Sequence, residues 1–426
     1  MDAKYVAKFV KIGSTPPSYD LDHPFEIIRP PVGFDEEPPI VPLIKRETKI
    51  AGYPVDFPLG LPASVLAANA QWIKFYAQRG FDILTYKTVR TVYRPAHPWP
   101  NWVFIKDPGE LTYPPDGVVG YPGYTPPDLT NVSMANSFGV PSLPPDWWQD
   151  DIRQARAAVK EGHQVFIVST ISSAEGTDER LIAEDFVKAA VMAKEAGADI
   201  IEANYSCPNV VGDKVGELFH SPTSAARVSK IIKTELKDTF GEKAPPLFVK
   251  IGYLPEQKLT DFVRYNAEFI DGVVAINTIS ARVLNEKGQE TFPGRPTAGI
   301  SGAAIRARAQ EVARTLVALK TKVFADFKKE LTVFGLGGVT KPEDAFTYLD
   351  IGVDAVETCT AAFVNPNFGL EMRLNKTAVE KTTNSSLLFE LKAFAKFLEE
   401  AAFHPRRKSR LRVDRRTRQV LVETET

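Results

Sequence analysis

The sequence predicts an α/β protein built as a (β/α)8 barrel (TIM barrel), and three observations favour this fold. Short apolar runs recur along the chain, stretches of helical periodicity separate them, and the series contains eight such units over about 310 residues. Alternating strands and helices imply a parallel sheet, and eight units are what a closed barrel with insertions requires. A doubly wound sheet is the main alternative.

The composition is that of a globular enzyme-sized protein. The chain has 426 residues, of which 44% are hydrophobic and 25% charged, and its net charge of -1 provides no overall field to attract nucleic acid or membranes. Its two cysteines, Cys207 and Cys359, are too few for a disulfide framework or an iron–sulfur cluster. The first residues lack the apolar core of a signal peptide, and no run approaches ~18 apolar residues. We expect a cytoplasmic protein with no membrane span and no metal site.

Residues 1–48 form a proline-rich extension, with Pro16-Pro17, Pro30-Pro31 and Pro38-Pro39 excluding a helix. Its apolar residues predict an ordered, extended wrap across the domain, and partial disorder is the alternative. The barrel unit follows over residues 49–372. Its predicted strands are Val55–Ala63, Phe81–Val89, Val165–Ile171, Ile200–Ser206, Leu247–Tyr253, Gly272–Ile279, Leu331–Val339 and Ala355–Thr360.

Amphipathic periodicity predicts helices between these strands. They are Glu179–Ala196, Ser221–Leu236, Pro255–Ala267, Gly302–Leu319 and Pro342–Ile351. The second unit differs, because residues 90–146 have no long helical pattern and twelve prolines lie between Pro95 and Pro145. We expect a long irregular insertion after strand 2, of the kind that forms a lid or a functional loop.

The last segment, residues 373–426, is expected to contain a C-terminal helix at Ser386–Ala402 and a basic tail. Arg406 to Arg418 contain eight basic residues against one acidic residue, Asp414. An anionic partner is one interpretation, and a solvated or inter-subunit tail is the more ordinary one. No aromatic residues interleave the basic ones, which argues against nucleic acid.

Polar side chains gather where several predicted strands end, and the carboxyl end of a barrel is where ligands bind. Strand 4 runs directly into Asn204-Tyr205-Ser206-Cys207-Pro208-Asn209, which brings a thiol and two carboxamides to this end. Strands 2, 5 and 6 add Lys87, Lys250, Asn277 and Thr278. A thiol among amide donors can serve as a base or a nucleophile on a polar planar substrate.

Lys250 lies within the apolar strand Phe248-Val249-Lys250-Ile251, where burial of an ammonium is costly without an anion or a polar acceptor. A cofactor group would satisfy it, and a lysine that snorkels to solvent is the alternative. Two glycine clusters, Gly299-Ile300-Ser301-Gly302 and Gly335-Leu336-Gly337-Gly338, lie near later strand ends, and Thr358-Cys359-Thr360 adds hydroxyls. Backbone N–H groups in such loops predict a phosphate site.

These motifs resemble those of the dihydroorotate dehydrogenase family and of the FMN-binding pyrimidine domain of dihydropyrimidine dehydrogenase. The similarity covers about residues 50–370, in the order expected for a barrel. The matching segments are Pro58-Leu59-Gly60-Leu61-Pro62-Ala63-Ser64, Lys87-Thr88-Val89, Asn136-Ser137-Phe138-Gly139, the segment Asn204 to Asn209, Val249-Lys250, Asn277-Thr278 and the two glycine clusters.

The resemblance implies an FMN-dependent flavoprotein oxidoreductase of pyrimidine metabolism. Cys207 would be the catalytic base, exchanging a proton at C5 while hydride passes between C6 and flavin N5. The implied substrate-binding residues are Lys87, Asn136, Ser137, Phe138, Gly139, Asn204, Asn209, Asn277 and Thr278. The implied cofactor-binding residues are Ala63, Ser64, Lys87, Lys250, Gly302, Gly337, Gly338, Cys359 and Thr360.

A cysteine base resembles the soluble class of the family, since the membrane-associated class uses serine. The substrate implied first is dihydroorotate, and dihydrouracil or dihydrothymine is the alternative, as is a barrel that binds a phosphate or flavin without turnover. Cys359 stands where the family usually has glycine, and Arg90 where threonine is common. The electron acceptor stays open between a small oxidant such as fumarate, a quinone and a separate electron-transfer subunit. Related enzymes are often dimers, so a homodimer is one expectation.

Overall fold

The computed structural model describes residues 17–42, 48–174, 176, 178–206, 218–379, 409–414 and 419–424. The predicted catalytic Cys207, the predicted substrate ligand Asn209 and the predicted helix Ser386–Ala402 lie outside these residues. The described residues therefore include most of the predicted barrel unit and two strands near the end of the chain.

A closed barrel of eight parallel strands is the centre of the fold, which confirms the predicted (β/α)8 architecture. Each predicted strand overlaps an observed one, and β15 pairs with β3 to close the cylinder. In chain order the barrel strands are β3 (Leu59–Leu61), β4 (Ile83–Val89), β8 (Val165–Thr170), β9 (Ile200–Asn204), β10 (Leu247–Ile251), β11 (Gly272–Ala275), β14 (Thr332–Leu336) and β15 (Ala355–Glu357).

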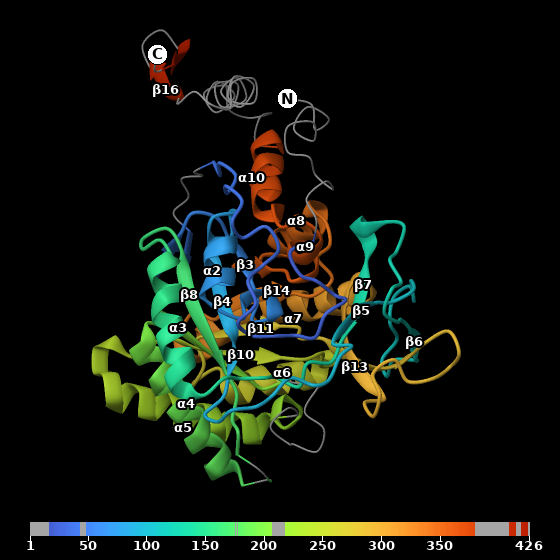
Figure 1. The fold of residues 1–426 in the computed structure, drawn as a ribbon. Coiled ribbons are helices and arrows are strands. Elements are labelled where there is room, and N and C mark those ends of the chain that lie inside the picture. The colour runs from blue at the N-terminus through green and yellow to red at the C-terminus, as the bar shows by residue number, and fades with distance from the viewer. Residues whose placement is uncertain are drawn as a thin grey trace.

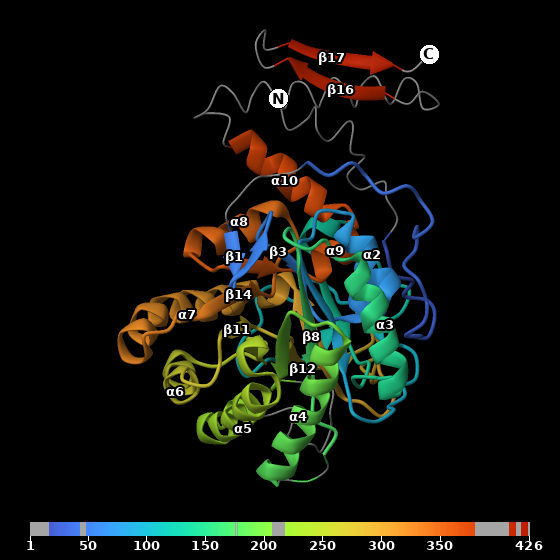
Figure 2. The same ribbon diagram turned by 90° about the vertical axis from the view of Figure 1, so that its left-hand side faces the viewer.

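Helices surround the strands, as Figures 1 and 2 show. The helix α4, Glu179–Ala196, shows why these segments are helical. The Asp178 side chain accepts a hydrogen bond from Arg180 N at its start, Gly197 ends it at φ 120°, and its inner face buries Phe186. The other helices of the described chain are α2 (Ala70–Ala77), α3 (Pro145–Ala158), α5 (Pro222–Phe240), α6 (Glu256–Asn266), α7 (Arg306–Phe327), α8 (Pro342–Ile351), α9 (Thr360–Val364) and α10 (Phe368–Val379).

A second sheet of five strands stands beside the barrel, at the right of Figure 1. It joins the insertion after β4 to a hairpin that follows β11. Its strand order is β5 (Trp102–Phe104), β7 (Ser133–Asn136), β13 (Thr297–Gly302), β12 (Ile279–Leu284) and β6 (Val118–Val119). The insertion expected to be irregular thus contributes three short strands, which fit between its prolines.

Two predicted boundaries were wrong where the chain passes between the barrel and the second sheet. The predicted strand Gly272–Ile279 ends at Ala275, and β12 begins at Ile279, because the chain leaves the barrel to join the second sheet. The helix predicted to begin at Gly302 begins at Arg306, after a 3-10 turn over Ala303–Ile305, because residues up to Gly302 pair with β7 as a strand.

The barrel interior changes from apolar to polar along its axis. Near the amino ends of the strands the interior is filled by apolar residues, and two positions further along β4, β8, β9, β10 and β15 it becomes polar or charged. The apolar part contains Ile83, Val165, Ile167, Ile200, Phe248, Val274, Phe334 and Ala355. The buried polar part contains Thr85, Ser169, Glu202, Lys250 and Glu357.

The described part of the N-terminal extension, residues 17–42, lies along α2, as predicted for an ordered wrap. Asn69 Nδ2 donates a hydrogen bond to Ile27 O (2.7 Å), and Trp72 Nε1 donates to Arg29 O (2.8 Å). A hairpin of β1 (Thr48–Ile50) and β2 (Tyr53–Val55) follows, and its apolar residues pack on the apolar part of the barrel interior. Near the end of the chain, β16 (Ser409–Asp414) pairs with β17 (Gln419–Thr424).

Candidate functional site

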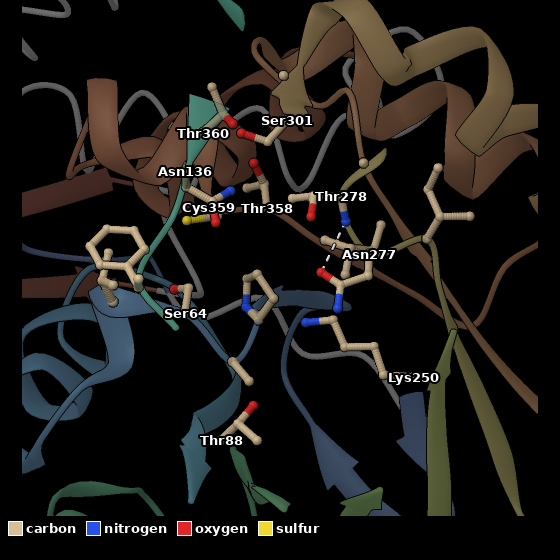
Figure 3. Close-up of a pocket in the computed structure, with 18 of the residues that line it drawn as sticks. Ser64, Thr88, Asn136, Lys250, Asn277, Thr278, Ser301, Thr358, Cys359 and Thr360 are labelled. Atoms are coloured by element: carbon tan, nitrogen blue, oxygen red, sulfur yellow. Dashed lines mark hydrogen bonds between the residues drawn. The ribbon is translucent and has the colours of Figure 1, made fainter. Parts of the chain in front are cut away.

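A cavity opens at the carboxyl ends of the barrel strands, between the barrel and the second sheet (Figure 3). Residues at the ends of seven of the eight barrel strands line it, together with residues from β7 and β13. It contains about 1030 Å³ of space between protein atoms, including the part open to solvent, which suits a large ligand.

Most of the residues predicted from the sequence meet at this cavity. Those that line it are Ala63, Ser64, Lys87, Asn136, Phe138, Asn204, Lys250, Asn277, Thr278, Gly302, Gly337, Gly338, Cys359 and Thr360. The cavity is therefore assembled from segments that are far apart in the chain.

Ser137 and Gly139 were also predicted to contact substrate, but they do not line the cavity. The side chains of β7 and the following loop alternate, so Phe138 faces the cavity while its neighbours turn away. His97 Nδ1 and Ser137 Oγ are 3.3 Å apart, and Arg295 Nη1 donates to Ser137 O (2.9 Å). A Cβ at Gly139 would lie 2.5 Å from His97 Nε2, so this glycine allows the loop to pack closely.

Two lysines bring positive charge to the cavity, and both are buried. Lys87 has 7% of its surface exposed and donates hydrogen bonds to Pro141 O (2.5 Å) and Thr88 O (3.4 Å). Lys250 has 3% exposed, and its ammonium has no hydrogen bond or ion pair within the part of the chain that the structure describes. A buried ammonium without a partner is costly, so Lys250 is suited to an acceptor on a bound ligand.

Three carboxamides face the cavity and are oriented by the chain around them. Asn204 Oδ1 accepts from Ser206 N (3.1 Å) and its Nδ2 donates to Thr88 Oγ1 (3.4 Å). Asn277 Nδ2 donates to Ser206 O, while Asn136 Nδ2 donates to Gly299 O (3.0 Å). These bonds fix the amide orientations, so the carboxamides present a defined set of donors and acceptors toward the cavity.

The opposite side of the cavity consists of glycine backbone and hydroxyl groups. Gly302, Gly337 and Gly338 have φ of +83°, +112° and +76°. A Cβ at Gly302 would lie 2.3 Å from Val132 O, and one at Gly338 would lie 2.3 Å from Arg306 Cα. Figure 3 shows the hydroxyl side chains of this side gathered away from Lys250 and Thr88. They belong to Ser301, Thr358 and Thr360.

Cys359 lies in this wall as a neutral thiol. Burial raises its pKa to about 11, against smaller opposing effects of a hydrogen bond with Ser64 and the charge of Lys250. A thiol with this pKa is neither a base nor a nucleophile near neutral pH. Cys359 therefore contributes shape and polarisability to the wall.

Several apolar residues of the cavity wall were not predicted from the sequence. Trp102, Ile276 and Ile305 line the cavity together with Phe138, which was predicted. Trp102 begins a short apolar run, Trp102-Val103-Phe104, inside the proline-rich insertion, and this was the one signal that could have identified it. Together these side chains provide apolar surface for a flat ring system.

Within the described ranges, no group of three or more His, Cys, Asp or Glu side chains is placed to hold a metal ion. Nor is any helix of those ranges long and apolar enough to cross a membrane.

The comparisons with known proteins agree with this arrangement. Residues 122–372 match the family model described as dihydroorotate dehydrogenase. The dihydroorotate dehydrogenase of Dictyostelium discoideum is 31% identical over 326 residues, which are 75% of this chain and 85% of that protein. The catalytic subunit of dihydroorotate dehydrogenase B (NAD(+)) from Methanocaldococcus jannaschii is 24% identical, over 73% of this chain and 85% of that protein.

A crystal structure of DHODH from Eimeria tenella in complex with ferulenol has a similar fold. The TM-score is 0.59 with 18% sequence identity, and the similarity covers 81% of this chain and 88% of that one. The family model spans more than half of this chain, and the Dictyostelium relative is similar over most of both sequences. The chain therefore belongs to the dihydroorotate dehydrogenase family.

Proposed function

We propose that this chain oxidises dihydroorotate to orotate, with FMN as its bound redox cofactor and residues 49–372 as the catalytic unit. The observation that carries the proposal is the two-sided composition of the cavity. One side is built of glycine backbone and hydroxyls, which suit a phosphate, and the other of carboxamides and lysines, which suit a pyrimidine. Membership of the dihydroorotate dehydrogenase family supports dihydroorotate as the substrate.

The residues present fit FMN. A Cβ at Gly302 or Gly338 would collide with neighbouring backbone, so only glycine lets these two loops keep the positive φ and close packing that form this side of the cavity. Lys250 supplies a buried ammonium without a partner among the described residues, which can face a polar edge of the ring. Trp102 and Phe138 supply apolar surface beside it.

Asn136, Asn204 and Asn277 would hold the substrate, together with Asn209 and Thr278. Carboxamides can pair with both the N–H and the C=O groups on the edge of a dihydropyrimidine. The substrate carries a carboxylate, and the buried ammonium of Lys87 provides the opposite charge at this end of the cavity. Dihydrouracil and dihydrothymine lack that carboxylate, so Lys87 favours dihydroorotate over them.

Cys207 is the proposed base, three residues after the cavity residue Asn204. A thiol of pKa ~8.5 is close enough to neutrality to accept a proton, whereas an unassisted hydroxyl is not. Cys207 takes the proton from C5 of dihydroorotate and later releases it to solvent. A bound FMN would supply the acceptor for the hydride that leaves C6, so that the C5–C6 bond becomes the double bond of orotate.

Anaerobic mixing tests this proposal. The purified protein is expected to carry FMN, and its visible absorbance should bleach with dihydroorotate and much less with dihydrouracil or dihydrothymine. In Cys207→Ala, FMN should stay bound while bleaching slows by about 10²–10⁴-fold, the usual contribution of a general base.

Cys207→Ser is the companion variant, since it keeps a side chain of similar size with a much weaker base. It should also bleach slowly. A protein that cannot be loaded with FMN, or a Cys207→Ala variant reduced at the wild-type rate, would contradict the proposal. Fumarate, a quinone and an electron-transfer subunit are then compared as acceptors for the reduced protein.

A further inference from the structure

Two glutamates and a lysine are buried together in the barrel interior, directly beneath the cavity. Glu202 on β9 has 1% of its surface exposed, Glu357 on β15 has none and Lys250 on β10 has 3%. Ionised side chains are rarely buried this deeply unless they are paired, and nothing in the proposed catalytic step uses the two carboxyl groups.

The two carboxyl groups are incompletely paired. Thr85 Oγ1 donates to Glu357 Oε1 (2.8 Å), but Glu357 Oε2 and Glu202 Oε1 are buried without a hydrogen-bond partner among the described residues. The barrel makes space for Glu357, because a Cβ at Gly60 would lie 2.8 Å from Glu357 Cγ. Glu357 is thus accommodated by the neighbouring strand β3, in which Gly60 is its partner in the register.

The charges in this layer do not balance if both acids are ionised. Among the described residues, the ammonium of Lys250 would face two carboxylates, because Lys87 Nζ donates to Pro141 O and the thiol of Cys359 is neutral. Two like charges in a dry interior cannot both persist, so one acid keeps its proton.

Strand order indicates which acid is ionised. β9 and β10 are neighbours, and Lys250 pairs in register with Asn204, two residues after Glu202. β15 lies on the far side of the barrel from β9. Burial and, to a smaller extent, the charge of Glu202 raise the pKa of Glu357 to about 8, against the opposing effects of Lys250 and of the hydrogen bond from Thr85.

We propose that Glu357 stays protonated while Glu202 is ionised, so that the pair places a single negative charge beneath Lys250. Glu202 then acts on the ammonium facing the cofactor through its charge and not through an ion pair, and Glu357 is the neutral partner that completes the layer. This inference rests on the proposed function for its cofactor, but the protonation of Glu357 is a property of the protein alone.

The proposal predicts different results for two similar substitutions. Glu357→Gln replaces a neutral acid by a neutral amide of the same shape, so the ratio of reduced to oxidised FMN at a fixed solution potential should stay within about threefold of wild type. Adding Glu202→Gln to that variant removes the negative charge beneath Lys250 and should raise the ratio at least tenfold, about 30 mV for two electrons. Using E357Q as the background prevents Glu357 from ionising in place of Glu202.

Glu371→Gln is the matched control. Glu371 is another acid with a raised pKa, about 7, but it bonds Asn365 on the outside of the barrel and does not line the cavity. Its substitution should leave the FMN potential unchanged. If E357Q alone shifts the potential as far as the double variant, or if neither shifts it, the proposal is wrong.

A second measurement separates this proposal from the proposed function. Infrared spectra of cofactor-free protein at neutral pH should show a buried carboxylic acid band of Glu357 that is lost in E357Q and retained in E371Q, where only the contribution of Glu371 (pKa about 7) disappears. Failure to bind FMN would overturn the proposed function and leave this band in place. Absence of the band in a protein that binds FMN and oxidises dihydroorotate would overturn only the assignment of the proton to Glu357.

Discussion

At the scale of single residues, Gly338 shows how closely the backbone is packed around the cavity. Its φ is +76°, and a Cβ there would lie 2.3 Å from Arg306 Cα, which is part of the backbone at the start of α7. Arg306 Nε also donates to Gly338 O (2.9 Å), so the loop and the helix are joined at this point. Neither the loop at Gly338 nor the start of α7 can move without displacing the side of the cavity that is proposed to bind the phosphate.

Gly338→Ala should therefore weaken FMN binding by at least about tenfold, because the loop must shift and the left-handed conformation adds roughly 1–2 kcal/mol of strain. Fluorescence titration of the cofactor-free protein with FMN measures this effect. Gly162→Ala is the control, since Gly162 has a similar φ of +77° with no atom within 4 Å of its would-be Cβ. Equal affinities for the two variants would show that steric exclusion at Gly338 is unimportant.

The sequence brought residues to one place where a side chain lies at or directly after the end of a strand. Asn204, Lys250 and Asn277 could be assigned to one cavity because parallel strands bring their carboxyl ends together. Ser137 does not line the cavity, since a run of four motif residues does not reveal which side chains alternate away from it. Ile305 was missed because its proximity depends on how the 3-10 turn before α7 meets the barrel.

At the scale of elements, the N-terminal segment completes an aromatic cluster behind the cavity. Tyr19 and Phe25 contact Phe138, with ring centroids 6.5 Å and 5.3 Å away. Phe138 and its neighbour Trp102 line the cavity, and their ring centroids are 6.3 Å apart. The extension is therefore part of the support for the cavity wall.

Phe25→Ala should destabilise the protein by about 3 kcal/mol, because Phe25 is 8% exposed and its removal leaves a gap against Phe138. Ile28→Ala, three residues later but 61% exposed, should cost less than about 0.5 kcal/mol. Thermal melting of the FMN-loaded variants gives the comparison. Similar melting temperatures for the two would mean that the segment does not support the wall.

Among the elements, the barrel strands were predictable and the second sheet was not. Continuous apolar runs identify buried parallel strands from local sequence alone. The five-stranded sheet instead pairs β7 with β13, more than 150 residues later, and strands of two to six residues carry little local signal. The cavity wall that this sheet provides could therefore not be derived from the sequence.

At the scale of the whole molecule, eight alternating units were enough to predict a closed barrel, but not the charge buried inside it. Glu202 and Glu357 lie in predicted strands, where a local pattern does not show whether an acid points inward or toward the helices. The register shows that the polar layer begins two residues beyond the apolar one. The barrel thus holds its ionisable groups next to the cavity, at a cost in stability that depends on pH.

That cost gives a prediction for the stability of the whole protein. The folded pKa of Glu357 is about 8, above the ordinary value of 4.5, so between these values the folded chain holds a proton that the unfolded chain has released. Its contribution to stability is complete below about pH 4.5 and is lost as the pH rises toward 8, by about 1.4 kcal/mol per pH unit. The glutamine in Glu357→Gln cannot titrate, so the stability of this variant should not fall over this pH range through position 357.

The melting temperature of E357Q should therefore rise relative to wild type as the pH increases from about 5 to about 8, and the difference should then level off. Glu371→Gln should behave similarly but level off near pH 7, because the folded pKa of Glu371 is about 7. Titrating groups that do not interact with the substituted acid cancel in each comparison, since they are common to both proteins. A constant difference between E357Q and wild type across this range would mean that Glu357 is ionised in the folded barrel, and the negative charge beneath Lys250 would then have to be assigned to Glu357.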